Sequence, residues 1–357
     1  MTPRPVAVLG AAGGVGTAAV AQLRDWGVGP LRLGGRDRYR LEKMIDALSL
    51  AAAEAVAVDL YRSEELARLC AGCRLVVNCA GPSHAVGDRV AIAALRAGAD
   101  YVDPGGDEPL HARCAGAERV VVVSAGSVPG LSALLIRALA AAGGGRLVAY
   151  AGGRGRFTFA AACDYLTAAA TTAGTPLAVW RDGAVLPAAD APLHGVRLPY
   201  FPGRVDAHPY VSHELARVAA AVGLAEATWY AVLAGVHVAE AVRARGEQDL
   251  HHAARALSRA AELDLFGRDP YQVFAIGLDD RTLTLRGSDP IALTGTMTAL
   301  AALAVDGGEL SPGAHYAGEV LDPERSLRRL EGAAAVDSVA LAPAALAPPD
   351  SVEEGVL

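Results

Sequence analysis

The stretch VAVLGAAGGVGTAAV, residues 6–20, decides the fold of the first part of the chain. An apolar run of strand length leads into a turn with four glycines, and an alanine-rich helical segment follows. Glycine allows a sharp turn and a close approach to a ligand, and a helix N-terminus offers phosphate its N–H groups and a positive dipole end. The stretch therefore predicts a dinucleotide site, although its spacing is G-x-x-G-x-x-G rather than G-x-G-x-x-G.

The alternation of strand and helix continues to about residue 127. The expected strands are apolar along their whole length, which is typical of a parallel sheet covered by helices on both faces. They span residues 6–10, 31–35, 55–60, 74–81, 99–103 and 119–126. The sequence predicts an α/β fold with a doubly wound parallel sheet, that is, a Rossmann domain.

Length and charge limit the possible partners. The 357 residues exceed what a single core usually supports, so we expect two domains. A net charge of −7, without a basic run interleaved with aromatic residues, argues against nucleic acid. We see neither an export signal nor an uninterrupted apolar run of membrane-spanning length, so we expect a cytoplasmic protein that does not bind membranes.

Cysteine and lysine usage excludes several kinds of chemistry. Cys70 and Cys73 form a C-x-x-C pair, which either serves redox or zinc chemistry or consists of ordinary buried thiols. A second pair and a nearby histidine are missing, which favours ordinary thiols. Lys43 is the only lysine, so a P-loop and any mechanism that needs a lysine elsewhere in the chain are excluded.

The end of the second strand indicates which dinucleotide is bound. NAD enzymes usually place an acidic residue about 20 residues beyond the glycines, whereas NADP enzymes need a cation there. Arg36 occupies this position, its planar fork suits a phosphate ester, and Arg38 or Arg40 could assist. The alternative is that Asp37 binds the ribose.

We therefore expect NADP(H) to contact the main chain of the glycine turn and the ends of several strands. Asp59 would reach the adenine edge, and the loop after the fourth strand would pass the nicotinamide ribose. Besides Arg36 and Asp37, the candidate cofactor-binding residues are Gly10, Ala12, Gly13, Gly14, Val15, Gly16, Asp59, Cys79, Ala80, Gly81 and Ser127.

Several stretches resemble the saccharopine dehydrogenase/reductase-like family of NADP-binding oxidoreductases. They are GAAGGVG (10–16), LRLGGRD (31–37), LVVNCAGPS (75–83), AGADYVDPGGD (97–107) and SAGSVPGLSALLIRALA (124–140), and residues 292–331 resemble the final segment of the family. The resemblance implies a Rossmann domain that binds NADP(H), a substrate domain inserted after it, and a terminal segment that returns to the first domain.

This organisation sets the expected boundaries. We expect a dinucleotide-binding domain at 1–127, an α+β substrate and dimerisation domain at 128–290, a helical segment packing on the first domain at 291–340, and a loosely held tail at 341–357. In the second domain we expect helices within 212–223 and 236–265 and a hairpin around Asp279 and Asp280. Residues 290–310 are expected to form an amphipathic helix.

Candidate substrate-binding residues lie in this second domain. Arg154 and Arg156 share one face of an expected strand and either clamp a carboxylate or are solvated edge charges. Residues 200–214 contain two prolines and Tyr210, and they are expected to form a lid over the cleft. We expect no metal, because His208 and His213 in this loop lack a third ligand.

Candidate catalytic residues follow the strands of the first domain, because ligands of open α/β sheets lie beyond the carboxyl ends of the strands. Ser83 and His84, Tyr101 and Asp103, and Ser127 take these places. We expect Asp103 to face a cationic substrate, His84 to donate a proton, and Tyr101 to lie beside them. Alternatively, Asp103 caps the next helix and His84 completes loop hydrogen bonds.

Members of the family mostly transfer hydride to or from a carbon bonded to nitrogen. The resemblance therefore implies an NADPH-dependent reductase of a C=N bond in an amino-acid-derived or carrier-attached intermediate. Two alternatives stay open: reduction of an activated C=C bond, and a non-catalytic NADP sensor. We expect a small-molecule or carrier-attached substrate and a homodimer.

Overall fold

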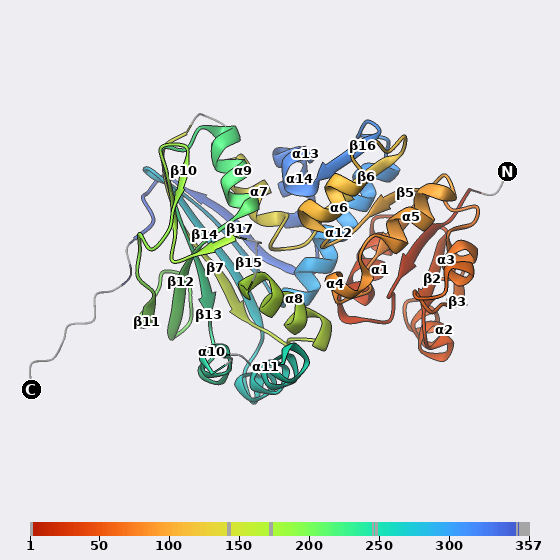
Figure 1. The fold of residues 1–357 in the computed structure, drawn as a ribbon, viewed down its shortest axis with the longest axis horizontal. Coiled ribbons are helices and arrows are strands. Elements are labelled where there is room, and N and C mark those ends of the chain that lie inside the picture. Colours follow the sequence, from red (N-terminus) through yellow and green to blue (C-terminus); the bar gives the residue numbers. More distant parts are fainter. Residues whose placement is uncertain are drawn as a thin grey trace, which may run out of the picture. The chain divides into compact units, whose positions relative to one another are not determined.

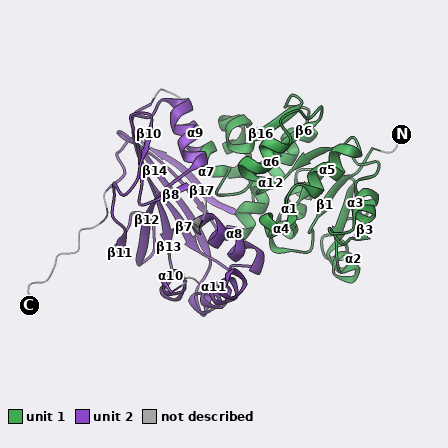
Figure 2. Cartoon of the chain, in the orientation of Figure 1, with its two compact units in different colours: residues 1–134, 291–333 green, residues 135–290, 334–357 purple. Residues whose placement is uncertain are grey.

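The computed structural model describes residues 3–140, 144–170, 174–244, 246, 249–347 and 349. Two compact units share the chain (Figure 2). Unit 1 comprises residues 1–134 and 291–333, and unit 2 comprises residues 135–290 and 334–357. The chain therefore leaves the first unit, builds the second, and returns.

Unit 1 is built on a seven-stranded sheet whose neighbouring strands are all parallel. The strand order β16-β6-β5-β4-β1-β2-β3 is that of a Rossmann fold with one added strand, which confirms the predicted fold class. Every residue of β1, β4 and β6 is buried, as a sheet covered on both faces requires. The strands are β1 (Val6–Leu9), β2 (Leu31–Gly35), β3 (Glu54–Ala57), β4 (Leu75–Asn78), β5 (Asp100–Val102), β6 (Val120–Val123) and β16 (Gly313–Tyr316).

Helices alternate with these strands, as the sequence predicts. Those of unit 1 are α1 (Gly14–Asp25), α2 (Arg38–Ala47), α3 (Ser63–Cys70), α4 (Ser83–Val86), α5 (Arg89–Arg96), α6 (Asp107–Arg113), α13 (Ala317–Val320) and α14 (Pro323–Glu331). The change from unit 1 to unit 2 lies within α7 (Leu131–Leu139), and α12 (Pro290–Asp306) carries the chain back. Apolar residues of α3, α5 and α6 join those of the strands in one buried cluster.

The returning segment is more deeply integrated than the sequence suggests. Helix α12 is buried around most of its surface, so the expected amphipathic pattern is absent. Gly295 makes its close packing possible, because a Cβ there would lie 2.6 Å from the Cβ of Ala18 and the carbonyl oxygen of Val15 in α1. The hydroxyl of Thr298 donates to the carbonyl of Ala125 at 2.9 Å. After α12, β16 adds a parallel strand beside β6.

Unit 2 contains a mixed sheet with the order β10-β9-β13-β7-β14-β15-β17, and β12 pairs with β13, β11 and β8. The expected hairpin is present, because β14 and β15 pair around Asp279. The strands are β7 (Arg146–Arg154), β8 (Gly174–Pro176), β9 (Val179–Arg181), β10 (Ala184–Leu186), β11 (Leu193–Arg197), β12 (Arg204–Ser212), β13 (Glu226–Leu233), β14 (Tyr271–Leu278), β15 (Arg281–Gly287) and β17 (Val336–Ala342).

The helices of unit 2 are α8 (Phe159–Ala170), α9 (His213–Val222), α10 (Val236–Arg243) and α11 (Leu250–Leu265). Helices α10 and α11 lie side by side and share an apolar cluster with α8 and Leu233 of β13 (Figure 1). None of the described helices is both long and apolar enough to cross a membrane.

Two segments differ from their predicted structure. The expected lid at 200–214 is mostly strand β12, whose odd-numbered residues from Val205 to Val211 are buried. The returning segment ends earlier than expected, because residues 336–342 form β17 on the sheet of unit 2. The start of the tail is held as well: Thr282 donates to the carbonyl of Ala344 at 2.7 Å. Residues 348 and 350–357 of the predicted tail lie outside the described residues.

Candidate nucleotide-binding and active site

The glycine turn after β1 is pressed against the loop after β4. Gly10 has φ +75°, and a Cβ there would lie 2.7 Å from the carbonyl carbon of Cys79 and the nitrogen of Ala80. Gly16 is equally constrained, because its Cβ would lie 2.2 Å from the carbonyl oxygen of Gly10. Both positions therefore require glycine for packing within the protein, before any ligand is considered.

The same turn leaves the N-terminus of α1 open. Gly13 is the N-cap residue and supplies no side chain to the first turn of the helix. Gly13 and Gly14 are exposed, and Ala12 and Val15 are half-buried. The first N–H groups of a helix have no acceptor within it. Those of Gly14, Val15 and Gly16 are therefore available to donate to the anion that the sequence predicts at this helix end.

The arginines after β2 have different partners. Asp37 is the N-cap of α2 and accepts a hydrogen bond from the nitrogen of Arg40 at 3.2 Å. Arg38 pairs with Glu42 at 2.8 Å, and the guanidinium of Arg40 donates to the carbonyl of Ala12 at 3.2 Å. Arg36 is exposed and has no hydrogen-bond or ion-pair partner among the described residues. This arrangement favours Arg36 over Asp37 as the residue that meets the ribose substituent.

Asp59 lies just after β3, where the sequence places it, and it also stabilises its own loop. Its carboxylate accepts a hydrogen bond from the nitrogen of Tyr61 at 3.0 Å, and its own nitrogen donates to Glu65 at 2.8 Å. The carboxylate is half-exposed, so it can still meet an adenine amino group.

Tyr101 and Asp103 point at each other in the interior of unit 1. Tyr101 is fully buried, Asp103 is 6% exposed, and the phenol donates to Oδ2 of Asp103 at 2.6 Å. Asn78 donates to the same oxygen at 2.9 Å, and the nitrogen of Gly105 donates to Oδ1 at 2.8 Å. Asp103 therefore does not face a substrate as we expected, and it does not cap α6, whose N-cap is Gly106.

This network reaches the nucleotide site through Asn78. The amide oxygen of Asn78 accepts a hydrogen bond from the nitrogen of Ala80 at 3.1 Å, and Ala80 borders Gly10. Tyr101 and Asp103 are thus positioning residues for the loop of Cys79, Ala80 and Gly81. Asn78 was not among the predicted site residues, although a polar residue that ends the apolar run LVVN is a usable signal.

The pKa values of this network follow from its burial. Burial raises the pKa of the Asp103 carboxyl, and the hydrogen bonds from Asn78, Tyr101 and Gly105 oppose that rise. Burial and the neighbouring carboxylate raise the pKa of Tyr101 well above its ordinary value.

In the C-x-x-C pair, burial raises the pKa of the Cys70 thiol to about 12, which agrees with an ordinary buried thiol.

The remaining candidates of unit 1 lie at the carboxyl edge of the sheet. His84 is exposed on α4, next to Ser83. A Cβ on Gly105, after β5, would lie 2.6 Å from the hydroxyl of Ser83, so the loops after β4 and β5 touch there. Ser127 shares a hydrogen bond of 2.9 Å with Thr294 of α12. Of the three predicted catalytic residues, His84 alone has an exposed side chain.

The substrate candidates of unit 2 have different surroundings. Arg154 ends β7, donates to the carbonyl of Asp269 at 3.0 Å and lies over the ring of Tyr271. Arg156 lies beyond the strand and is exposed, so the expected shared strand face does not form. Tyr210 donates to the carbonyl of Ala168 in α8, which gives it a packing role inside the unit.

Replacing Tyr101 by Phe removes one donor from a buried carboxylate. We expect the free energy of unfolding to fall by about 1–3 kcal/mol near neutral pH, measured by denaturant titration. A folded pKa above the unfolded value means that the folded state binds protons more tightly, so stability falls as pH rises through this interval. The hydrogen bond from Tyr101 opposes the rise in the pKa of Asp103, so it stabilises the charged carboxylate more than the neutral acid. The cost of Tyr101→Phe should therefore shrink in acid, where Asp103 becomes protonated. Tyr61→Phe, at an exposed ring, should cost little.

Replacing Arg36 by Ala should weaken the binding of NADPH about 10- to 100-fold and leave that of NADH nearly unchanged. The reason is that one charge-assisted contact to the 2′-phosphate contributes about 1.5–3 kcal/mol. Isothermal calorimetry with both nucleotides measures the effect. Arg38→Ala is the matched control, because its side chain already pairs with Glu42. Equal loss for both nucleotides would contradict the assignment.

Part of the chain matches a protein family, and several solved structures are similar to the chain or to part of it. Residues 6–123 match the family model described as the saccharopine dehydrogenase NADP binding domain. Apo histidine-tagged saccharopine dehydrogenase (L-Glu forming) from Saccharomyces cerevisiae is similar with a TM-score of 0.66 and 12% sequence identity, over 95% of this chain and 100% of that chain. Triphenylmethane reductase from Citrobacter sp., complexed with NADP(H), matches 28% of this chain and 36% of its own, at 21% identity and a TM-score of 0.24.

The search of curated proteins gave no match. The family match covers the part of unit 1 that holds the glycine turn, Arg36 and the loop after β4, and it makes NADP(H) the cofactor. The structural similarity covers nearly the whole chain. On these findings residues 6–123 form an NADP-binding domain of the saccharopine dehydrogenase type, in a chain that has the fold of a saccharopine dehydrogenase.

Proposed function

We propose that the protein uses NADPH to reduce a C=N bond in an amino-acid-derived or carrier-attached intermediate. The observation that carries the proposal is the nucleotide end of unit 1, with its open N-terminus of α1 and the unpartnered Arg36, in a chain with the fold of a saccharopine dehydrogenase. The cofactor supplies the hydride. The protein binds and orients both reactants.

Reduction of an imine asks little acid–base chemistry of the protein. Hydride adds to the carbon of a protonated C=N bond, and the product nitrogen keeps the proton, so one donor suffices. His84 fits this role because its exposed imidazole lies on α4, just beyond the loop of residues 79–81. The buried Asp103 instead holds that loop through Asn78.

Two arginines of unit 2, Arg154 and Arg156, are candidates for binding a carboxylate of the substrate. Arg156 is exposed, without a partner among the described residues, whereas Arg154 is half-buried beside Tyr271. A free guanidinium can hold a carboxylate bidentately. We propose Arg156 as the main substrate-binding residue, because Arg154 already donates to the carbonyl of Asp269. The expected homodimer and cytoplasmic location stay predictions.

A turnover assay tests the reaction class. NADPH is mixed with the protein and with a panel of carboxylated cyclic imines, amine and keto-acid pairs, and enoyl thioesters, and the loss of reduced-nicotinamide absorbance is followed. We expect turnover with C=N compounds. Turnover with enoyl compounds alone would instead establish C=C reduction. Tight NADPH binding without any turnover would favour a non-catalytic NADP-binding sensor.

Replacing His84 by Gln tests the proton donor. With an imine substrate near neutral pH, kcat should fall about 10²- to 10⁴-fold, because the substrate nitrogen is no longer protonated in the complex. The KM for NADPH should stay unchanged, and lowering the pH should restore part of the rate. His252→Gln, at an exposed position of α11, is the control. An unchanged kcat would remove His84 from the mechanism.

A further inference from the structure

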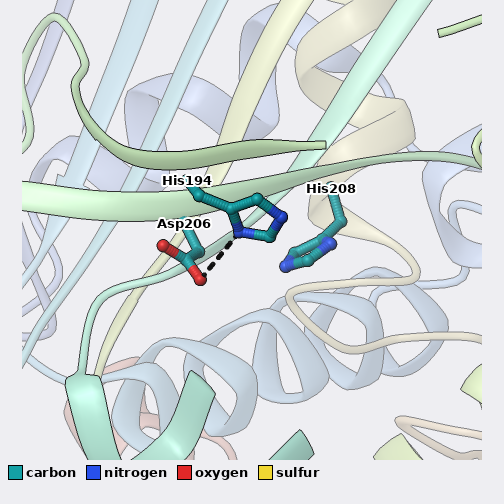
Figure 3. A group of neighbouring side chains, drawn as sticks. All are labelled: His194, Asp206 and His208. Carbon is teal, nitrogen blue, oxygen red and sulfur yellow. Dashed lines mark hydrogen bonds and ion pairs between the residues drawn. The ribbon is translucent and has the colours of Figure 1, made fainter. Parts of the chain in front are cut away.

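The outward-facing side of strands β11 and β12 carries two imidazoles and one carboxylate that point toward one another. They belong to His194, Asp206 and His208, and Figure 3 shows the three side chains converging on the same side of the two strands. Their potential ligand atoms all lie within 4.8 Å of one another. His194 is exposed, and the other two side chains are half-buried, so the group is open to solvent.

The local structure explains this convergence. Asp206 and His208 are two residues apart on β12, so they share a face, while Val205 and Ala207 point into the apolar core. Leu193 pairs with Ala207, which places His194 opposite Asp206. The register then shifts before Val196, at a bulge where Gly195 has φ +60°. The nitrogen of Gly195 donates to Oδ1 of Asp206 at 2.9 Å and fixes the carboxylate.

Both oxygens of Asp206 already take part in hydrogen bonds, so a metal ion would compete with the groups that contact them. Nδ1 of His194 lies 3.2 Å from Oδ2 of Asp206, and the rings of His194 and His208 have centroids 5.6 Å apart. Arg243 of α10 reaches the same Oδ2 at 2.8 Å. The guanidinium of Arg243 thus already supplies a positive charge next to the carboxylate of Asp206.

We propose that His194, Asp206 and His208 form a binding site for a divalent transition-metal ion, with zinc as the expected ion. Two imidazole nitrogens and one carboxylate oxygen form a common zinc ligand set that leaves the fourth position to water. Zinc bonds of about 2.0–2.2 Å require the ligand atoms to close to about 3.4 Å from one another. Rotation of the exposed His194 and release of Arg243 provide this movement. Bound zinc would link β11 to β12 across the bulge.

Calorimetric titration of the chelator-treated protein with zinc alone tests the site. We expect one zinc ion per chain, and His194→Gln and His208→Gln should each weaken binding at least about tenfold, because each removes a ligand atom. His251→Gln, at an exposed histidine of α11, should change nothing. Undiminished zinc binding in the double variant His194→Gln/His208→Gln, or no zinc binding by the unsubstituted protein, would overturn the proposal.

Arg243 gives a test in the opposite direction. Replacing Arg243 by Gln removes a competing cation from Oδ2 of Asp206, so zinc should bind more tightly. A ligand that binds the folded state raises the melting temperature. Zinc should therefore raise the Tm of the unsubstituted protein and of Arg243→Gln, but not that of the double histidine variant. Circular dichroism checks that this variant is folded. Weaker zinc binding by Arg243→Gln would count against the site as described.

Discussion

The nucleotide end of unit 1 depends on one close backbone approach, that of Gly10 to Cys79 and Ala80. The turn after β1 and the loop after β4 touch main chain to main chain, and a methyl group at Gly10 would overlap both residues. The loop is held from its other side by a chain of hydrogen bonds that runs from Tyr101 through Asp103 and Asn78 to Ala80. Two backbone segments that the cofactor would contact are thereby fixed before it binds, which lowers the ordering cost of binding.

The return of the chain supports the same region. Helix α12 can approach α1 because Gly295 lies against Ala18 and Val15, near the N-terminus of α1. Hydrogen bonds from Thr298 to Ala125 and between Thr294 and Ser127 fasten this helix to the segment after β6. The segment after unit 2 is therefore part of the nucleotide-binding unit and not a peripheral addition.

Features that depend on local pattern could be predicted from the sequence, and features that depend on distant pairing could not. The strands and helices of unit 1 and the glycine turn follow from apolar runs, turn residues and helix signals. Tyr101 and Asp103 were predicted as catalytic residues, together with His84, because position along the chain places both at the end of a strand and says nothing of their burial. Strand β12 was hidden by Pro209, which is uncommon inside a strand. The contact of His194 with His208 needs both the pairing of β11 with β12 and the bulge at Gly195, and neither has a local signal.

The expected selection of NADP over NAD depends on which charged side chains after β2 already have partners within the protein. Four charged residues follow β2, at positions 36, 37, 38 and 40, and three of them have partners within the protein. Asp37 caps α2, Arg38 pairs with Glu42, and Arg40 donates to the carbonyl of Ala12 in the glycine turn. Arg36 remains exposed and unpartnered among the described residues. A 2′-hydroxyl gains little from a solvated guanidinium, whereas a phosphate gains a charge-assisted contact without displacing any intramolecular one. The proposed preference for NADP(H) would then come from Arg36, the one cation of this group that is not already paired, in a chain whose net charge is negative.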